Sequence, residues 1–204
     1  MSKKPIIVFE GIEGSGKSFH IENITKYFRK KKIKFTTIRE PGGNKNSEKI
    51  RRLVLDNKSS FNKNTDLLLY LSARSENIDF IKKNIGKKII LIDRFTDSTL
   101  AYQHYGMGVN LNFIKKINDF LTRNIKIDLT FLNLVNQQNM KKRLLKRKKL
   151  NRYDKFSSIF YKKVQNGFLK LRKQNPKKYV IIDSNKDIND NKKIILNKII
   201  KLIK

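Results

Sequence analysis

Residues 6–18 read IIVFEGIEGSGKS. The apolar run at residues 6–9 is typical of a buried strand, and residues 11–18 match the pattern G-x4-G-K-[S/T]. In this pattern the glycines allow a tight turn whose backbone N–H groups point at phosphate oxygens, and the next helix adds its positive N-terminal end. The stretch therefore predicts a strand, a phosphate-binding loop and a helix, in that order.

Each part of this phosphate-binding loop, or P-loop, has an expected role. Its residues are Gly11, Ile12, Glu13, Gly14, Ser15, Gly16, Lys17 and Ser18. We expect Lys17 to reach the β- and γ-phosphates of ATP and the hydroxyl of Ser18 to ligate the accompanying Mg²⁺. A GTPase would add a guanine-reading Asn-Lys-x-Asp, and the Asn-Lys-Asp at residues 185–187 has the wrong spacing. A kinase is the better interpretation.

Apolar runs and helical spacing alternate along the rest of the chain. Runs rich in Ile, Val and Leu predict strands at residues 5–10, 34–39, 88–93, 127–133 and 178–183. Apolar residues spaced three and four apart predict helices at residues 17–31, 46–56, 64–83, 110–124, 136–148, 155–174 and 187–203. This alternation predicts an α/β class, with a P-loop NTPase-like parallel five-stranded sheet flanked by helices. We expect one domain over residues 1–204, with a small helical lid at about residues 141–155.

The composition indicates a cytoplasmic protein with no membrane partner. No apolar run approaches the roughly 20 residues of a membrane-spanning helix. The start, MSKKP, lacks the apolar segment of a secretory signal, and the sequence has no Cys for disulfides. The net charge of +31, from 48 Lys and Arg against 17 Asp and Glu, suggests a nucleic-acid partner. Because the basic residues are spread along the whole chain, we favour a solvated surface and no specific nucleic-acid partner.

Several further motifs are similar to those of one enzyme family. REPGG stands at residues 39–43, DRF at 93–95, DSTLAYQ at 97–103 and RKKLNRYD at 147–154. With the P-loop and residues 160–171, these motifs resemble the bacterial thymidylate kinase family. The resemblance implies an enzyme that transfers the γ-phosphoryl group of ATP to dTMP, giving dTDP and ADP and supplying dTTP for DNA synthesis. It also implies a homodimer.

Two arginines are expected to hold the phosphate of the acceptor. Arg39 and Arg94 follow predicted strands, where open α/β sheets bind ligands, and guanidinium groups suit two-pronged phosphate contacts. The resemblance assigns both to the dTMP phosphate and gives Arg94 and Lys17 catalytic roles. It also places Asp93 at the metal with Ser18, and Glu13 at the sugar 3′-hydroxyl and the transfer site.

The expected base and sugar contacts come from two helical segments. Tyr70 and Arg74 are four residues apart on a predicted helix and therefore share a face. The resemblance implies that Tyr70 stacks on thymine and that Arg74 bonds a base carbonyl. It implies further that Ser98 and Gln103 border the base, and that Tyr102 crowds the position of a ribose 2′-hydroxyl.

The lid is expected to provide a catalytic arginine. The resembled family carries this arginine either inside the P-loop or in the lid, and residues 12–15 contain none. Arg147, which has the family's spacing to Arg152, is the preferred candidate, with Arg143 and Lys148 as alternatives.

Three residues depart from the family pattern. Met107 stands where an arginine is usual, Phe19 replaces a threonine, and Asn151 replaces a lid aspartate, which we expect to loosen the lid's hydrogen bonding. The histidines, His20 and His104, are isolated and are interpreted as neither metal ligands nor bases.

Two other functions stay open at this stage. A P-loop deoxynucleoside kinase would phosphorylate a sugar hydroxyl and need a general base in place of phosphate-binding arginines. A basic nucleic-acid-binding protein with a vestigial P-loop would explain the charge but not the intact Lys17, Ser18 and Asp93.

Overall fold

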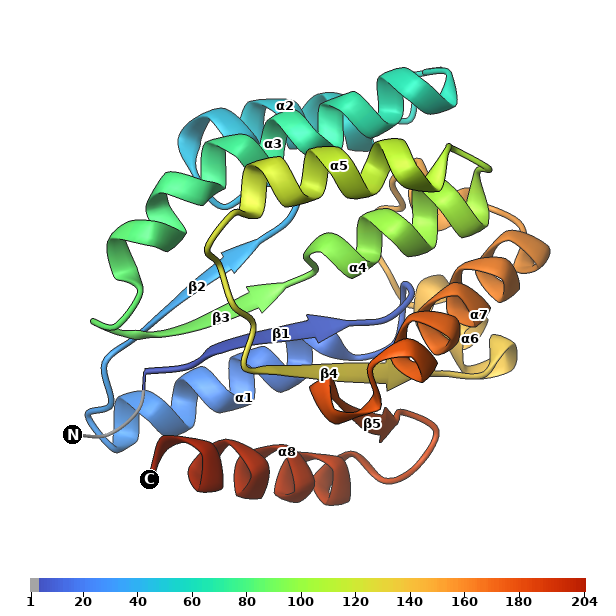
Figure 1. Ribbon diagram of the computed structural model, residues 1–204. Coiled ribbons are helices and arrows are strands. Elements are labelled where there is room, and N and C mark those ends of the chain that lie inside the picture. The colour runs from blue at the N-terminus through green and yellow to red at the C-terminus, as the bar shows by residue number, and fades with distance from the viewer. Residues whose placement is uncertain (1–3) are drawn as a thin grey trace.

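The computed structural model describes residues 4–204, so the expectation about a signal at the start of the chain rests partly on residues outside that range. In the described chain, five parallel strands form one sheet in the order β2-β3-β1-β4-β5 (Figure 1). The strands are β1 (Ile6–Glu10), β2 (Phe35–Arg39), β3 (Ile89–Asp93), β4 (Leu129–Leu134) and β5 (Tyr179–Asp183). The predicted α/β class and five-stranded parallel sheet are confirmed.

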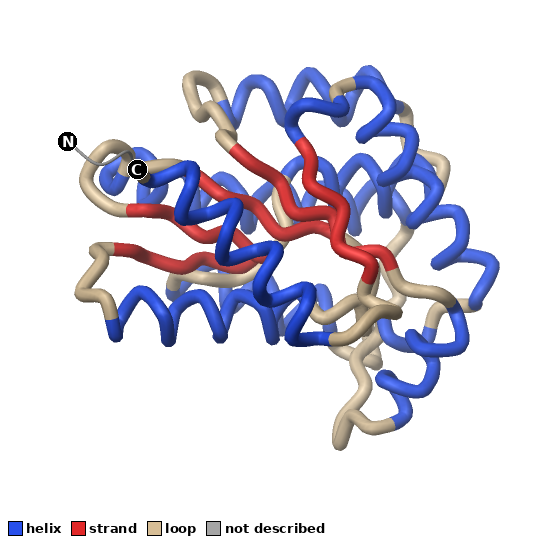
Figure 2. Tube along the Cα trace, turned by 90° about the horizontal axis from the view of Figure 1, so that it is seen from below, coloured by secondary structure: helices blue, strands red, loops and turns tan. Residues whose placement is uncertain are grey.

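Helices cover both faces of this sheet, as Figure 2 shows. They are α1 (Lys17–Lys30), α2 (Lys45–Leu55), α3 (Lys63–Asn84), α4 (Thr96–Thr99), the π-helix η1 (Leu100–Gly106), α5 (Leu111–Thr122), α6 (Gln137–Leu145), the 3-10 helix η2 (Tyr153–Lys155), α7 (Ser158–Gln174), the 3-10 helix η3 (Pro176–Lys178) and α8 (Ile188–Ile203). Asparagine side chains cap the amino ends of α2, α3, α5 and α6, each accepting a backbone N–H bond. The many asparagines of this chain therefore help to set helix boundaries.

Strand β1 is apolar from Ile6 to Phe9 because both of its faces are buried, and it ends on the buried carboxylate of Glu10. Ile7 and Phe9 join the core formed with α1 and α8, while Ile6 and Val8 join the core formed with α3. Successive side chains of a strand point to opposite faces, so a strand between two helical layers presents apolar residues to both of them.

The order of the strands places the P-loop at a topological switch point. From β1 the chain forms β2 and β3 on one side, and then crosses to β4 and β5 on the other side. In such sheets the ligand site lies at the carboxyl ends of the strands, where the order reverses. The P-loop follows β1 at this point.

Two expectations about helices are corrected by the structure. Helix α6 ends at Leu145, whereas the apolar spacing predicts a helix to residue 148, and residues 146–152 are not helical. The region expected to form the lid therefore consists of the end of α6, a non-helical segment and η2. Residues 96–106 lie outside the helices predicted from apolar spacing, although Ser98 and Tyr102 are expected to share a helical face; there α4 continues into the wider turn of η1. Apolar periodicity at 3.6 residues does not detect a π-helix, whose hydrogen bonds span five residues.

Candidate functional site

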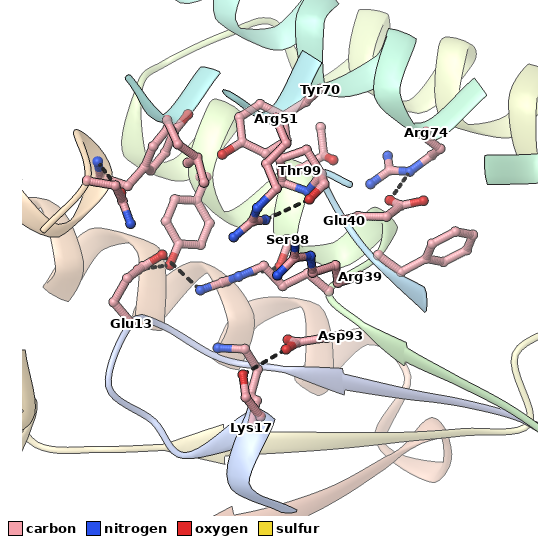
Figure 3. Close-up of a pocket in the computed structure, with 18 of the residues that line it drawn as sticks. Glu13, Lys17, Arg39, Glu40, Arg51, Tyr70, Arg74, Asp93, Ser98 and Thr99 are labelled. Carbon is pink, nitrogen blue, oxygen red and sulfur yellow. Dashed lines mark hydrogen bonds and ion pairs between the residues drawn. The ribbon is translucent and has the colours of Figure 1, made fainter. Parts of the chain in front are cut away.

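A pocket opens at the carboxyl ends of β1, β2 and β3, and α2, α3, η1 and the lid complete its walls (Figure 3). The predicted site residues that line it are Glu13, Lys17, Ser18, Arg39, Tyr70, Arg74, Asp93, Arg94, Ser98, Tyr102, Gln103 and Arg147. Those outside its lining are Gly11, Ile12, Gly14, Ser15, Gly16, Arg143 and Arg152. The fold thus gathers residues from distant parts of the sequence around one cavity.

The P-loop wraps closely around the end of β1. Gly11 has a φ of 138°, and a Cβ there would lie 2.3 Å from the carbonyl oxygen of Asn133, so only glycine fits. Lys17 is buried, and its Nζ donates to the carbonyl oxygens of Gly11 at 2.9 Å and Ile12 at 3.0 Å. Burial, and then the neighbouring Arg94, lower the pKa of Lys17 to about 8.

Ser18 and Asp93 form the candidate metal site. The hydroxyl of Ser18 donates to Oδ2 of Asp93 at 2.9 Å, at the mouth of the P-loop. Among the described residues no cluster of three or more His, Cys, Asp or Glu side chains could hold a metal by itself. A nucleotide-bound Mg²⁺ needs only one or two protein oxygens, because phosphates and water supply the rest. The hydroxyl and carboxylate therefore fit this ion.

Arg94 lines the pocket and has a strained backbone conformation. Its φ is 68°, a left-handed value that is costly for a residue with a side chain. The guanidinium donates to the carbonyl of Gly11 and to the carboxylate of Glu13, both at 2.8 Å. Burial alone would raise the pKa of Glu13, but Arg94 and Lys17 hold it below its usual value. The hydroxyl of Tyr102 also donates to Glu13.

A second side of the pocket carries two arginines from β2 and α2. Arg39 is half-exposed and makes a two-pronged contact with Glu48, at 2.9 Å and 3.0 Å from one nitrogen. Arg51 is more buried and donates to the carbonyl of Pro41 at 2.6 Å. Burial is the main cause that lowers the pKa of Arg51, and the positive charge of Arg39 lowers it further. Arg51 could not be recognised as a pocket residue from the sequence, because it is one of many basic residues on a predicted helix.

Arg74 and Tyr70 both reach the pocket from α3, but their surroundings differ. Arg74 has a side chain only 2% exposed, and donates to Glu40 at 2.7 Å and to Asn118 at 2.6 Å. Burial raises the pKa of Glu40, although Arg74 opposes this. The ring of Tyr70 packs edge to face against Tyr153, with centroids 5.7 Å apart.

Ser98 and Gln103 are held by carboxylates behind the pocket wall. The hydroxyl of Ser98 donates to Glu10, which also accepts the backbone N–H of Phe95 at 2.8 Å. Glu10 is fully buried, and burial and then Asp97 raise its pKa to about 7. The amide of Gln103 donates to Asp66 at 3.4 Å.

The lid arginines have three different environments. Arg147 lines the pocket, has a side chain 40% exposed and pairs with Asp154. Arg143 donates to the carbonyls of Gly14 at 2.9 Å and Ser184 at 2.6 Å, which places it against the back of the P-loop. Arg152 pairs with Asp66, away from the pocket lining.

Asn151 makes several hydrogen bonds around Asp154, and the expectation that it holds the lid less tightly than an aspartate stays a prediction. Its side-chain amide donates to Asp154 at 2.7 Å and accepts the backbone N–H groups of Tyr153 at 2.8 Å and Asp154 at 3.3 Å. Asparagine can both donate and accept, so it bonds the backbone at the start of η2 and also holds the neighbouring carboxylate.

The other unusual residues lie around the site without lining it. Met107 packs against the apolar cores near α7 and α5, and Phe19 is 43% exposed. His20 is buried, and burial and then Arg143 lower its pKa to about 4. His104 Nδ1 lies 2.8 Å from the carbonyl oxygen of Val109.

A sheet with its P-loop at the switch point, facing an arginine-lined pocket beneath a basic lid, defines the class of P-loop phosphotransferases. The family model of thymidylate kinase matches residues 9–195 of this chain. The chain belongs to the thymidylate kinase family, and the resemblance noted from the sequence is confirmed.

Relatives match over most of their length. The thymidylate kinase of Thermosipho africanus is 39% identical over 187 residues, covering 90% of this chain and 92% of that one. The thymidylate kinase of Mycoplasma capricolum subsp. capricolum is 37% identical over 202 residues, covering 97% and 93%. The crystal structure of thymidylate kinase from Ehrlichia chaffeensis superposes with a TM-score of 0.77 at 28% identity, covering 98% of this chain and 99% of that chain.

In residues 4–204, no helix is both long enough and apolar enough to cross a membrane.

Proposed function

We propose that this protein is a thymidylate kinase that transfers the γ-phosphoryl group of ATP to dTMP, giving dTDP and ADP. The observation that carries the proposal is that the P-loop lysine Lys17 and the arginines Arg39 and Arg94 line one pocket. A phosphate donor and a phosphate acceptor can therefore meet there. The names of the relatives support dTMP as the acceptor.

The donor half of the reaction belongs to the P-loop. The Nζ of Lys17 now bonds carbonyl oxygens of the loop, and phosphate oxygens of ATP would replace them as its partners. Ser18 and Asp93 would hold Mg²⁺, which when bound supplies neutralisation of charge on the β- and γ-phosphates. Phosphoryl transfer needs positioning and neutralisation of charge more than covalent chemistry from the protein.

The acceptor half belongs to the strand ends, α3 and η1. Arg94 and Arg39 would bind the phosphate of dTMP, and Glu13 would meet the sugar beside the transfer site. Around the base and sugar we place Tyr70, Arg74, Ser98, Tyr102 and Gln103. The contacts of Arg74 with Glu40 and Asn118 would fix its donors in place before the base arrives.

The lid would deliver the catalytic arginine. Arg147 lines the pocket and is paired with an almost fully buried carboxylate, whereas Arg143 and Arg152 are committed to other partners. Its guanidinium would stabilise charge on the phosphoryl group in transit, an effect worth roughly 10³ to 10⁵ in rate in related enzymes.

The test is a coupled assay of ADP release with ATP, Mg²⁺ and a panel of acceptors: dTMP, dUMP, dCMP, GMP and thymidine. We expect dTMP to be preferred, and the variant Lys17→Ala to lose turnover while keeping its far-ultraviolet circular dichroism. Preference for thymidine would favour a deoxynucleoside kinase. Preference for dCMP or GMP would overturn the assignment.

We place the enzyme in the cytoplasm, as a homodimer and without a specific nucleic-acid partner. Membership of the thymidylate kinase family supports the cytoplasmic location and the homodimer. Light scattering of the purified protein measures the molar mass and so tests for the dimer. The charge of +31 supports weak binding to DNA that falls by orders of magnitude between low and moderate salt. Tight, sequence-selective binding at physiological salt would contradict this.

A further inference from the structure

The side chain of Asp66 connects three parts of the site without lining the pocket. It lies in the first turn of α3, is 1% exposed, and accepts from the guanidinium of Arg152, the hydroxyl of Tyr153 and the amide of Gln103. Two of these donors belong to the lid and one to η1. A buried carboxylate with a cationic and a phenolic donor is a strong and directional contact.

The segment around Arg152 is fastened to α2 as well. The backbone N–H of Arg152 donates to the carbonyl of Leu55 at 3.2 Å, and its Nε donates to the carbonyl of Val54 at 3.0 Å. The amide of Asn57 donates to the carbonyl of Leu150 at 2.9 Å. The two bonds from Arg152 use carbonyl groups at the carboxyl end of α2, and the third joins residue 57, just beyond α2, to the lid. The second half of the lid is therefore attached to the body of the enzyme.

The attached half of the lid carries the carboxylate that holds Arg147. Asp154 follows Tyr153 directly, its side chain is 1% exposed, and it pairs with the guanidinium of Arg147. The position of Arg147 therefore depends on where residues 151–154 are fixed. The same residues contact the acceptor side of the pocket, because the ring of Tyr153 packs against that of Tyr70.

We propose that Asp66 is a positioning residue, which fixes the lid so that Asp154 presents Arg147 to the transferring phosphoryl group. This inference rests on the proposed function. A carboxylate is required because all of its partners donate hydrogen bonds. Asparagine would keep the shape but turn an N–H group toward Arg152 or Tyr153.

The experiment is a double-mutant cycle with ATP and dTMP. Asp66→Asn should lower kcat between about 10- and 100-fold, with a much smaller change in the KM for ATP, because a small displacement of a catalytic group is costly. In the Arg147→Ala background, the same substitution should change kcat less than about twofold, since no arginine is left to misplace.

Asp97→Asn is the matched control. Like Asp66, Asp97 is a buried carboxylate that accepts from one cationic side chain and one tyrosine hydroxyl. Its donors are Lys178 at 3.2 Å and Tyr179 at 2.7 Å, and neither belongs to the lid. Its effect on kcat should be the same with and without Arg147. Amide hydrogen exchange gives a readout besides activity: Asp66→Asn should speed exchange over residues 146–152, and Asp97→Asn should not.

If Asp66→Asn does not fold, Tyr153→Phe replaces it in the double-mutant cycle, because this variant removes only one hydrogen-bond donor to Asp66 and keeps the aromatic ring. It should lower kcat, and again only when Arg147 is present. The inference is overturned if Asp66→Asn or Tyr153→Phe lowers kcat by the same factor in the Arg147→Ala background as in the wild-type enzyme. It is also overturned if kcat of these variants stays near the wild-type value when Arg147 is present. Absence of dTMP turnover in the unmodified enzyme would instead overturn the proposed function.

Discussion

The hydroxyl of Ser18 donates a hydrogen bond to Oδ2 of Asp93 at 2.9 Å, although the two residues are 75 positions apart in the chain. Parallel pairing of β1 with β3 brings them together, since Phe9 and Asp93 are partners in register at the ends of those strands. The contact joins the P-loop to the strand end that carries Arg94. We propose that these two oxygens, the hydroxyl of Ser18 and Oδ2 of Asp93, bind Mg²⁺.

Ser18→Ala should therefore raise the Mg²⁺ concentration needed for half-maximal turnover by about tenfold or more, because one of two protein oxygens is lost. Ser18→Thr keeps the hydroxyl and should restore most of the affinity. Titration of the rate with Mg²⁺ at fixed ATP measures this. Equal Mg²⁺ requirements in all three proteins would remove Ser18 from the metal site.

Replacing Arg39 or Arg74, the two arginines proposed to bind the acceptor dTMP, by alanine should affect binding and stability differently. Arg39 is half-exposed, so Arg39→Ala should raise the KM for dTMP roughly 10- to 100-fold and change the free energy of unfolding by less than about 1 kcal/mol. Arg74→Ala leaves Glu40 buried without its cation and should cost about 3–5 kcal/mol of stability. Urea unfolding and steady-state kinetics measure the two effects.

Arg74→Ala combined with Glu40→Gln is the control for this difference. Removing both charges should recover part of the lost stability, because no unpaired charge then stays buried. If Arg74→Ala unfolds at the wild-type urea concentration, the ion pair contributes nothing and the contrast with Arg39 is wrong.

Arg147→Ala should lower kcat by at least about 10³-fold with little change in ground-state affinity for ATP, because its charge is needed only during transfer. Arg147→Lys should recover part of the loss, since an ammonium keeps the charge but not the planar fork. The neighbouring, exposed Lys149 provides the control, and Lys149→Ala should stay near wild type. Similar near-wild-type rates for both alanine variants would make Arg143 or Arg152 the next candidate.

The raised pKa of Glu10 predicts a pH dependence of stability. Its pKa is about 7 in the folded protein because of burial and then Asp97, against 4.5 for an ordinary glutamate. Between these values the folded state binds more protons than the unfolded state, so stability falls as pH rises from about 5 to about 7. The loss attributable to Glu10 is on the order of 3 kcal/mol.

Urea unfolding between pH 5 and 8 measures this loss in wild type and in Glu10→Gln. The variant should show a clearly shallower decline, because its amide does not titrate, while Glu40 and the other carboxyls still contribute equally in both proteins. Glu76→Gln, at an exposed position on α3, should keep the wild-type slope. An unchanged slope in Glu10→Gln would contradict the prediction.

Much of the fold could be predicted from local patterns. The predicted strands agree with the structure to within two residues at each end, because a parallel sheet covered by helices on both faces is rich in Ile, Val, Leu and other apolar residues. The segment at residues 96–106 could not be predicted in this way, since α4 is short and η1 has the wider π-helical turn. The end of α6 at Leu145 was also missed, because the lysines and arginines beyond it are compatible with a helix or a loop.

Some residues of the candidate site could be predicted from the sequence, and others could not. The P-loop and the strand-end residues Asp93 and Arg94 were found because their roles depend on spacing along the chain. The sequence indicates for Glu10 only that it ends a predicted strand. Its contacts with Phe95 and Ser98 depend on packing between β1 and α4.

By itself the sequence determined the α/β class, the position of the P-loop and the family, since these depend on residue types at fixed short spacings. Only the tertiary structure decided what each arginine does. Arg74 meets Glu40 across 34 positions and Arg152 meets Asp66 across 86, whereas Arg147 meets Asp154 only seven positions away and lines the pocket. Arginines look alike in a sequence, and their long side chains reach several partners. Which partner each one takes follows from the packing of α2, α3 and the lid, and no local pattern encodes that packing.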